Sequence, residues 1–303
     1  MNIVFIGTPD FATNILKELL LENFCIKTLV CAEDKAVGRK MILTPPDTKK
    51  FILQNYPSIE ILQPKTLKDK TIVEHIKNLN PDFIVVAAYG KILPKNILDI
   101  APCINLHGSI LPKYRGASPI QSMILNADNI FGVTAMKMGE GLDDGDMLGF
   151  SMCKNSGQNS TLLFDELSKM AAKLCVKVLR NYDSIMPLKQ FDAISSSCVK
   201  IKKSDGVVSF DNNIDDVMNK FKAYFGWPGI YFENGLKLLD IRKNSNKNID
   251  NKGIITNITK DGFCVSFNGG ELEILSLQEV SKKAVLAKDF INGKRLKVGD
   301  RIC

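Results

Sequence analysis

The sequence predicts an α/β protein: a doubly wound, mainly parallel sheet followed by a small antiparallel β-barrel. Two observations support this fold class. Short apolar runs alternate with helical patterns over residues 1–150, and short strand patterns separated by turn residues follow a polar stretch near residue 200. At 303 residues the chain is long enough to form two hydrophobic cores. We therefore expect a first domain at residues 1–182, a basic linker at 183–206 and a barrel domain at 207–303.

The predicted sheet is assigned from short apolar runs in the first domain. These runs lie at residues 3–6, 26–31, 59–62, 83–88 and 103–106. Apolar residues at helical spacing lie between them, at Phe11, Ile15, Leu19 and Leu20 and again at Ile72, Ile76 and Leu79. Such alternation favours a parallel sheet whose ligands bind at the carboxyl ends of the strands. Residues 131–138 alternate like an edge strand, and a long amphipathic helix is expected from Ser160.

The second half of the chain has weaker patterns and more turn signals. The linker contains Lys200, Lys202 and Lys203, three positive charges within four residues, and one helical pattern follows it. Turn signals then separate several short strands, at Asn234-Gly235, 251–253, Asp261-Gly262 and Gly269-Gly270. This spacing indicates a small antiparallel β domain.

Composition limits the function without defining it. The formal net charge of +7 permits an anionic partner such as RNA but does not require one. The eight cysteines form no Cys-x-x-Cys pair and are expected to be reduced, mostly buried thiols. The chain begins with a predicted strand, without a basic or apolar leader, and no apolar run has the length of a membrane span. We expect a cytoplasmic monomer with no metal and no membrane partner.

Asn105 and His107 lie two residues apart, where the apolar run at 103–106 ends. Because a strand alternates faces with a period of two, both side chains are expected on the same side. The loop at 141–146 supplies Asp143, a carboxylate that can orient or charge the imidazole. An amide, a histidine and a carboxylate without a nucleophile beside them favour acyl-type transfer, in which the substrate brings the nucleophile. The alternative is a histidine with purely structural hydrogen bonds.

A dinucleotide or ATP site is disfavoured at the turn after the first strand. Residues 7–10 occupy the place of a phosphate-binding loop, but they lack the Gly-x-Gly-x-x-Gly pattern. Pro9 also removes one backbone amide that such a loop would use. In isolation this segment is a strand-to-helix turn.

Several motifs together resemble the folate-dependent formyltransferases. They include Asn-x-His at 105–107, Ser-x-Leu-Pro at 109–112, Lys-Tyr-Arg-Gly at 113–116 and Gly-Leu-Asp-x-Gly-Asp at 141–146. Further matches lie at 6–12, 38–40, 86–90, 200–203, 227–229 and 293–297. The matches run in order from residue 3 to residue 301, so they cover essentially the whole chain. The resemblance also implies that the C-terminal β domain is an OB-like barrel.

The resemblance implies 10-formyltetrahydrofolate as the formyl donor and assigns roles at the site. Asn105 would donate to the formyl oxygen, a protonated His107 would add charge assistance, and an ionised Asp143 would stabilise that ring and help to collect the proton released by the amine. The folate pocket would include Ser109, Ile110, Leu111 and Pro112, with isoleucine where the family usually has leucine. Asp144 stands where the family usually has threonine. A magnesium site formed by Asp143, Asp144 and Asp146 is a weak alternative, because formyl transfer involves no phosphate.

Within the family, the chain is most similar to the branch that acts on initiator methionyl-tRNA. The long basic insertion at 33–50 would contact the tRNA acceptor end through Arg39 and Lys40, and Lys200, Lys202 and Lys203 would follow the phosphate backbone. The simpler interpretation of both segments is a solvated surface. Two alternatives for the whole chain are a folate-dependent formyltransferase or hydrolase with a small substrate, and a non-catalytic RNA-binding protein.

Overall fold

The computed structural model describes residues 1–38, 40–246 and 250–302, and the chain forms two compact units. The first unit contains Met1–Ile120, Asn129–Ser156 and Leu162–Lys200. The second contains Gln121–Asp128, Gly157–Thr161 and Ile201–Cys303. Residues 183–200, which we predicted as part of a linker, therefore belong with the first unit.

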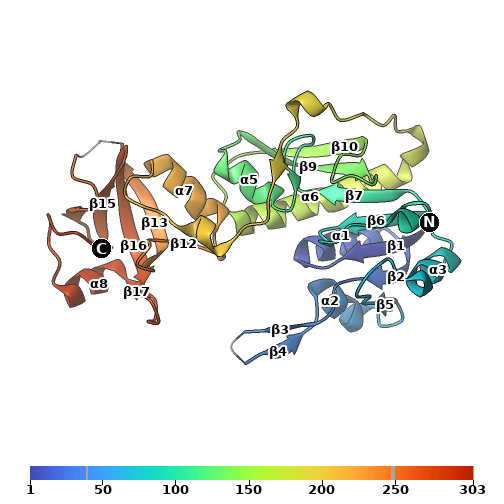
Figure 1. The fold of residues 1–303 in the computed structure, drawn as a ribbon, viewed down its shortest axis with the longest axis horizontal. Helices are drawn as coiled ribbons and strands as arrows, with labels where there is room; N and C mark the ends of the chain where they lie inside the picture. Colours follow the sequence, from blue (N-terminus) through green and yellow to red (C-terminus); the bar gives the residue numbers. More distant parts are fainter. Residues whose placement is uncertain (39, 247–249, 303) are drawn as a thin grey trace. The chain divides into compact units, whose positions relative to one another are not determined.

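The first unit is built on a seven-stranded sheet in the order β10-β9-β7-β6-β1-β2-β5 (Figure 1). The strands are β1 (Asn2–Gly7), β2 (Cys25–Val30), β5 (Glu60–Leu62), β6 (Phe83–Ala87), β7 (Cys103–His107), β9 (Ile130–Lys137) and β10 (Met147–Lys154). The five strands from β5 to β7 are parallel, whereas β9 is antiparallel to both of its neighbours. The order reverses between β1 and β6, as expected for a doubly wound sheet. The predicted mainly parallel α/β fold is confirmed.

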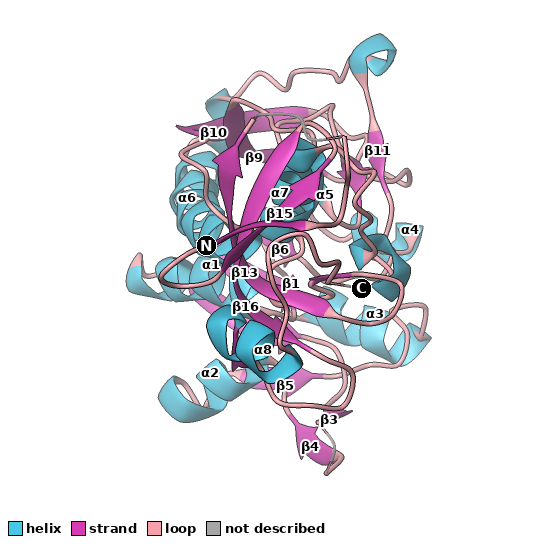
Figure 2. Ribbon diagram, turned by 90° about the vertical axis from the view of Figure 1, so that its left-hand side faces the viewer, coloured by secondary structure: helices cyan, strands magenta, loops and turns pink. Residues whose placement is uncertain are grey.

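Helices cover both faces of this sheet because its central strands are apolar on both sides. Val4 and Ile6 of β1 pack with apolar residues of α3 (Lys70–Asn78) and α4 (Lys95–Leu98), while Ile3 and Phe5 are equally buried. Helices α1 (Asp10–Leu21) and α6 (Ser160–Arg180) lie on the opposite side (Figure 2). An Asn14–Ser168 hydrogen bond of 2.7 Å joins these two helices.

The edge strand of the sheet is β10, and the expectation of an edge strand at 131–138 is wrong. Strand β9 lies between β7 and β10, and its six central residues are buried. The alternation of buried and more exposed side chains falls on β10 instead, where Met152 is 61% exposed. The loop at 138–146 joins β9 to this last strand, and its first residue, Met138, donates its N–H to the Cys103 carbonyl at the start of β7.

The basic insertion at 33–50 forms a hairpin and the start of a helix. Strands β3 (Lys35–Val37) and β4 (Ile42–Thr44) pair with each other, and α2 (Asp47–Asn55) follows. At the base of the hairpin, Lys49 donates hydrogen bonds to Asp34 at 2.8 Å and to Gln63 at 2.7 Å. The hairpin is thus fixed at its base, while its strands are exposed to solvent.

The second unit is the predicted antiparallel β domain. Its sheet has the order β12-β13-β16-β15-β14, and β17 also pairs with β16. The bounds are β12 (Ile230–Tyr231), β13 (Lys237–Ser245), β14 (Ile255–Ile258), β15 (Phe263–Phe267), β16 (Gly270–Gln278), β17 (Val285–Leu286), α7 (Ile214–Ala223) and α8 (Ala287–Lys294). The rings of Phe210, Phe232 and Phe267 form a cluster with centroid distances of 4.6 to 6.2 Å. No ladder between described residues joins β14 to β12, which agrees with the partly open barrel of an OB fold.

Several short elements connect these parts. They are β8 (Arg115–Gly116), α5 (Pro119–Leu125), the 3₁₀ helices at Tyr182–Ser184, Asp192–Ile194 and Lys203–Gly206, and β11 (Ser197–Cys198). The described cysteines are free thiols, of which Cys25 is exposed. Burial raises the pKa of Cys103 to about 12, so this thiol stays protonated. Within the described residues, no helix has the length and apolarity needed to cross a membrane.

The cluster of Phe210, Phe232 and Phe267 gives a test of the hydrophobic core of the second unit. Phe267 is fully buried and contacts two other rings, so Phe267→Ala should destabilise the protein by about 3–5 kcal/mol through lost burial and a cavity. Urea unfolding followed by circular dichroism measures this change. The control is Phe191→Ala, whose ring is 67% exposed and whose loss should change stability by less than about 0.5 kcal/mol. Equal effects of the two substitutions would contradict the assigned core.

Candidate active site

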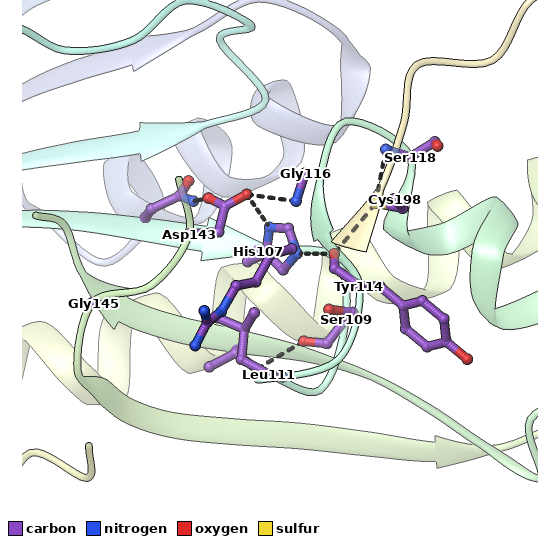
Figure 3. A network of polar contacts seen from close by, with 12 residues as sticks. His107, Ser109, Leu111, Tyr114, Gly116, Ser118, Asp143, Gly145 and Cys198 are labelled. Carbon is purple, nitrogen blue, oxygen red and sulfur yellow. Dashed lines mark hydrogen bonds and ion pairs between the residues drawn. The ribbon is translucent and has the colours of Figure 1, made fainter. Parts of the chain in front are cut away.

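The structure brings Asn105, His107 and Asp143 together at the carboxyl end of β7. Asn105 and His107 project from the same side of the strand and are 9% and 5% exposed. The Asn105 amide Nδ2 donates to Asp143 Oδ1 at 3.3 Å, and His107 Nδ1 lies 3.6 Å from Asp143 Oδ2 (Figure 3). Asp143 reaches them from the loop between β9 and β10. The Asp143 carboxylate therefore contacts the side chains of both Asn105 and His107.

The backbone of the Asp143 loop is held in an uncommon conformation. Asp143 has a φ of +51°, a left-handed conformation that aspartate tolerates better than most non-glycine residues. The Gly116 backbone N–H donates to Asp143 Oδ2 at 2.9 Å. Gly116 itself has a φ of +122°, and a Cβ there would collide with the carbonyl oxygen of Cys198. Glycine at 116 thus permits the close approach of the Cys198 backbone, and its positive φ belongs to the backbone conformation in which its N–H faces the carboxylate.

The hydrogen bonds of His107 define which nitrogen faces the acid. Nε2 lies 2.9 Å from the Tyr114 carbonyl oxygen, and because a carbonyl only accepts, Nε2 must bear a hydrogen and donate it. Nδ1 is then the nitrogen that faces Asp143. A second proton on the ring would lie on Nδ1 and point at the carboxylate. The pair can therefore share a proton between Nδ1 and Oδ2.

The Tyr114 carbonyl is held in turn by residues 196–198, which the sequence analysis assigned to a linker. The Tyr114 N–H donates to Ser196 Oγ at 3.0 Å, and the Cys198 thiol donates to the Tyr114 carbonyl at 3.3 Å. Strand β11 pairs in parallel with β8, which extends this contact to Arg115 and Gly116. Nothing in the local sequence of these polar residues indicates a partner some 80 positions earlier, so the sequence analysis missed them.

Residues 109–112, predicted for the folate pocket, lie directly after β7. The Ser109 hydroxyl donates to the Lys113 carbonyl at 2.6 Å, and the Leu111 side chain packs in a buried cluster with Met136 and Met147. Pro112 is buried, whereas Ile110 is half-buried. The side chains of Ser109 and Leu111 thus stabilise the turn beside the site, and the assignment of this segment to folate stays a prediction.

The predicted RNA-contacting residues that the structure describes are exposed but do not form one site. Lys40 lies beside the β3–β4 hairpin, and Arg39 falls outside the described residues. Lys200, Lys202 and Lys203 are all exposed, with Lys200 in the first unit and the other two in the second. In the loop after β9, the Asp144 carboxylate folds back against Gly141 rather than toward His107. Among the described residues no group of acidic, histidine or cysteine side chains has the arrangement of a metal site.

Comparison with known proteins connects this geometry to an enzyme family. A family model described as "Formyl transferase" matches residues 1–202, and one described as "Formyl transferase, C-terminal domain" matches residues 200–295. The chain is 57% identical over 302 residues to a methionyl-tRNA formyltransferase of Campylobacter hominis, covering 100% of both chains. It is 51% identical over 303 residues to the one of Campylobacter jejuni strain RM1221, covering 99% of each.

Solved structures share the fold at much lower identity. HypX from Aquifex aeolicus in complex with tetrahydrofolic acid is 14% identical with a TM-score of 0.66, over 99% of this chain and 48% of that one. WlaRD, a sugar 3N-formyl transferase, is 19% identical with a TM-score of 0.67, over 93% of this chain and 99% of that one. At such identities the likeness shows the fold.

The close approach at Gly116 yields a test of the site geometry. Gly116→Ala should destabilise the protein by at least about 1–3 kcal/mol, because the new Cβ collides with backbone and the left-handed φ is strained. It should also shift the NMR signals of His107, which are readily assigned in a chain with two histidines. The control is Gly299→Ala, with a φ of +97° and no heavy atom within 4 Å of the added Cβ. Unchanged His107 signals in Gly116→Ala would contradict the described contact.

Proposed function

Because the chain belongs to the methionyl-tRNA formyltransferases, we propose that it transfers the formyl group of 10-formyltetrahydrofolate to the α-amine of methionine on initiator tRNA. The observation that supports this reaction most directly is the cluster at the end of β7, where the Asp143 carboxylate accepts a hydrogen bond from Asn105 and lies 3.6 Å from His107 Nδ1. Ligands of doubly wound sheets bind at that edge. The amine of the acceptor is the nucleophile, so the protein needs only to stabilise the formyl oxygen and to accept a proton.

The available hydrogen-bond donors match the charge that develops. As the amine nitrogen bonds to the formyl carbon, negative charge grows on the formyl oxygen, and then the bond from that carbon to the folate nitrogen breaks. Within the described residues, the Asn105 amide makes one hydrogen bond, to Asp143, so its second N–H is available for the formyl oxygen. The amine loses one proton and the departing folate nitrogen gains one. The His107–Asp143 pair, which can share a proton, is suited to this exchange.

The surface of the first unit supports a macromolecular acceptor. The β3–β4 hairpin has exposed basic and apolar side chains, with Met41, Ile42 and Leu43 at least 61% exposed. Basic groups can contact phosphates, and exposed apolar groups can pack against bases at the end of a duplex. We assign Arg39 and Lys40 to the acceptor end of the tRNA, and Lys200, Lys202 and Lys203 to the phosphate backbone. A small-substrate enzyme would have no use for an exposed hairpin of this composition.

The same proposal includes the donor pocket, the location and the assembly state. We assign Ser109, Ile110, Leu111 and Pro112 to the wall beside the folate, where Ile110 is the side chain with free surface. Translation initiation takes place in the cytoplasm, and we place the protein there. We propose a monomer, because one chain supplies the complete set of Asn105, His107 and Asp143.

The chemistry is tested by substituting the three side chains singly. Asn105→Ala, His107→Ala and Asp143→Ala should each lower kcat by at least ~10²-fold, because each removes a contact that is strongest in the transition state. The affinity for initiator tRNA should stay near that of the unsubstituted protein. Turnover is measured with 10-formyltetrahydrofolate and charged initiator tRNA.

Asp144→Thr is the matched control for these variants. It changes a carboxylate in the same loop that folds away from His107, so kcat should be nearly unchanged. Near-full turnover in any of the three alanine variants would remove that residue from the mechanism. Loss of turnover in Asp144→Thr would reopen the choice of acid.

The acceptor is tested at Arg39. Arg39→Ala and Arg39→Lys should both strongly impair formylation of charged initiator tRNA, because lysine keeps the charge but lacks the planar fork of guanidinium. Neither substitution should affect formyl transfer to a small amine or hydrolysis of the donor. The control is Lys77→Ala on α3, which removes one positive charge from an exposed position of the first unit. An unchanged rate with tRNA in both Arg39 variants would argue for a small natural substrate.

A further inference from the structure

We propose that Gln190, oriented by Arg115, is a positioning residue that sets the backbone of the catalytic loop and thereby the place of the Asp143 carboxylate. Gln190 lies in the stretch that the sequence presents as a polar linker. This inference rests on the proposed function, because it assigns to Gln190 an effect on the rate of formyl transfer. Gln190 acts through Asp143 and is not itself a group that touches the substrate.

Both polar atoms of the Gln190 side-chain amide make hydrogen bonds that hold the loop or orient the amide. Its Nε2 donates to the carbonyl oxygens of Asp143 and Gly145, both at 2.8 Å. Its Oε1 accepts from Arg115 Nε at 2.8 Å. Because a guanidinium can only donate, Arg115 forces the oxygen of the amide toward itself and the NH₂ group toward the two carbonyls. The orientation of the amide is therefore fixed by chemistry.

The catalytic loop needs such a support because little else holds its backbone. Leu142 is 63% exposed and Asp144 is exposed, so the neighbours of Asp143 bury little apolar surface. Asp143 itself has a left-handed φ of +51°, a conformation that persists only when surrounding contacts define it. The contacts with Asn105 and Gly116 hold the carboxylate, whereas Gln190 holds the main chain.

Strand β8 connects these two kinds of support. Gly116 donates its backbone N–H to the Asp143 carboxylate, and the adjacent Arg115 holds Gln190. Arg115 is fixed further by its NH2 group, which donates to Asp192 at 2.8 Å, and by its backbone N–H, which donates to Ser196. Two neighbouring residues of β8 therefore constrain both the side chain and the main chain of Asp143. Displacement of the Gln190 amide would release the main chain of Asp143, whereas the Gly116 N–H would still hold its carboxylate.

Gln190→Glu provides a sharp test because it keeps the size of the side chain. An oxygen replaces the NH₂ group and faces two carbonyl oxygens, so both hydrogen bonds to the loop are lost, while Arg115 keeps its acceptor. We expect kcat to fall about 10- to 100-fold, as for a displacement of a catalytic group by about 1 Å. The KM values for donor and tRNA should change less than about threefold. The pH profile of kcat should also change shape, because the proton shared by His107 and Asp143 is displaced.

A second variant and two controls accompany this substitution. Gln190→Met has similar length without hydrogen-bonding atoms and should lower kcat in the same direction; it replaces the first variant if Gln190→Glu does not fold. Gln54→Glu introduces the same charge change at an exposed position of α2 and should leave kcat and its pH profile unchanged. Arg115→Lys should retain more activity than Arg115→Ala. The double variant Arg115→Ala with Gln190→Met should lose much less than the product of the single losses.

The outcomes separate this inference from the proposed function. If His107→Ala is inactive while Gln190→Glu and Gln190→Met keep the kcat and pH profile of the unsubstituted protein, the positioning role is overturned and the proposed chemistry stands. If His107→Ala also keeps full activity, the proposed chemistry fails and the role of Gln190 fails with it. A fall in kcat with unchanged KM and an altered pH profile supports the positioning role.

Discussion

The hydrogen bond from the Gly116 N–H to the Asp143 carboxylate is the constraint on which the rest of the site depends. It joins the loop after β9 to β8, the short strand that follows β7 in the chain. Asn105 and His107 can meet the carboxylate only if it is held within reach of the strand end. The fold supplies the strand, and this contact, together with those from Asn105 and Gln190, holds the acid. The absence of a side chain at 116 lets the backbone of Cys198 lie against the residue that makes this contact.

The two ring nitrogens of His107 face different partners, a backbone carbonyl and a carboxylate. Nε2 donates to the Tyr114 carbonyl, which also accepts a hydrogen bond from the Cys198 thiol. The Tyr114 N–H donates to Ser196 Oγ, and this contact also holds Tyr114 in place. Nδ1 faces Asp143 and is the nitrogen at which a proton can be gained or lost. The ring therefore cannot rotate to exchange its nitrogens without breaking a buried hydrogen bond. A fixed ring orientation is what proton transfer at one stated atom requires.

Local patterns predicted much of the fold and part of the site. The buried strands β1, β2, β6 and β7 were predicted within about two residues, since each is a short, mainly apolar run between turns. Strand β10 was missed because its alternation of apolar and polar residues is short and interrupted by Gly149. Spacing and motif predicted that Asn105, His107 and Asp143 lie together, and the structure places them in contact. Gln190 and Ser196 were not, because each contributes through a partner 47 to 82 residues away and has no neighbour that marks its role.

The polar stretch at 183–200 shows why composition is a poor guide to a domain boundary. Most of its side chains are polar or exposed, which is typical of a linker, yet its contacts belong to the first unit. Those contacts are made by an amide, two hydroxyl- or thiol-bearing residues and a two-residue strand, none of which requires apolar residues. Polarity here reflects the kind of bond that holds the segment, and not a lack of structure. The last segment of the first unit therefore ends at Lys200, two residues after Cys198.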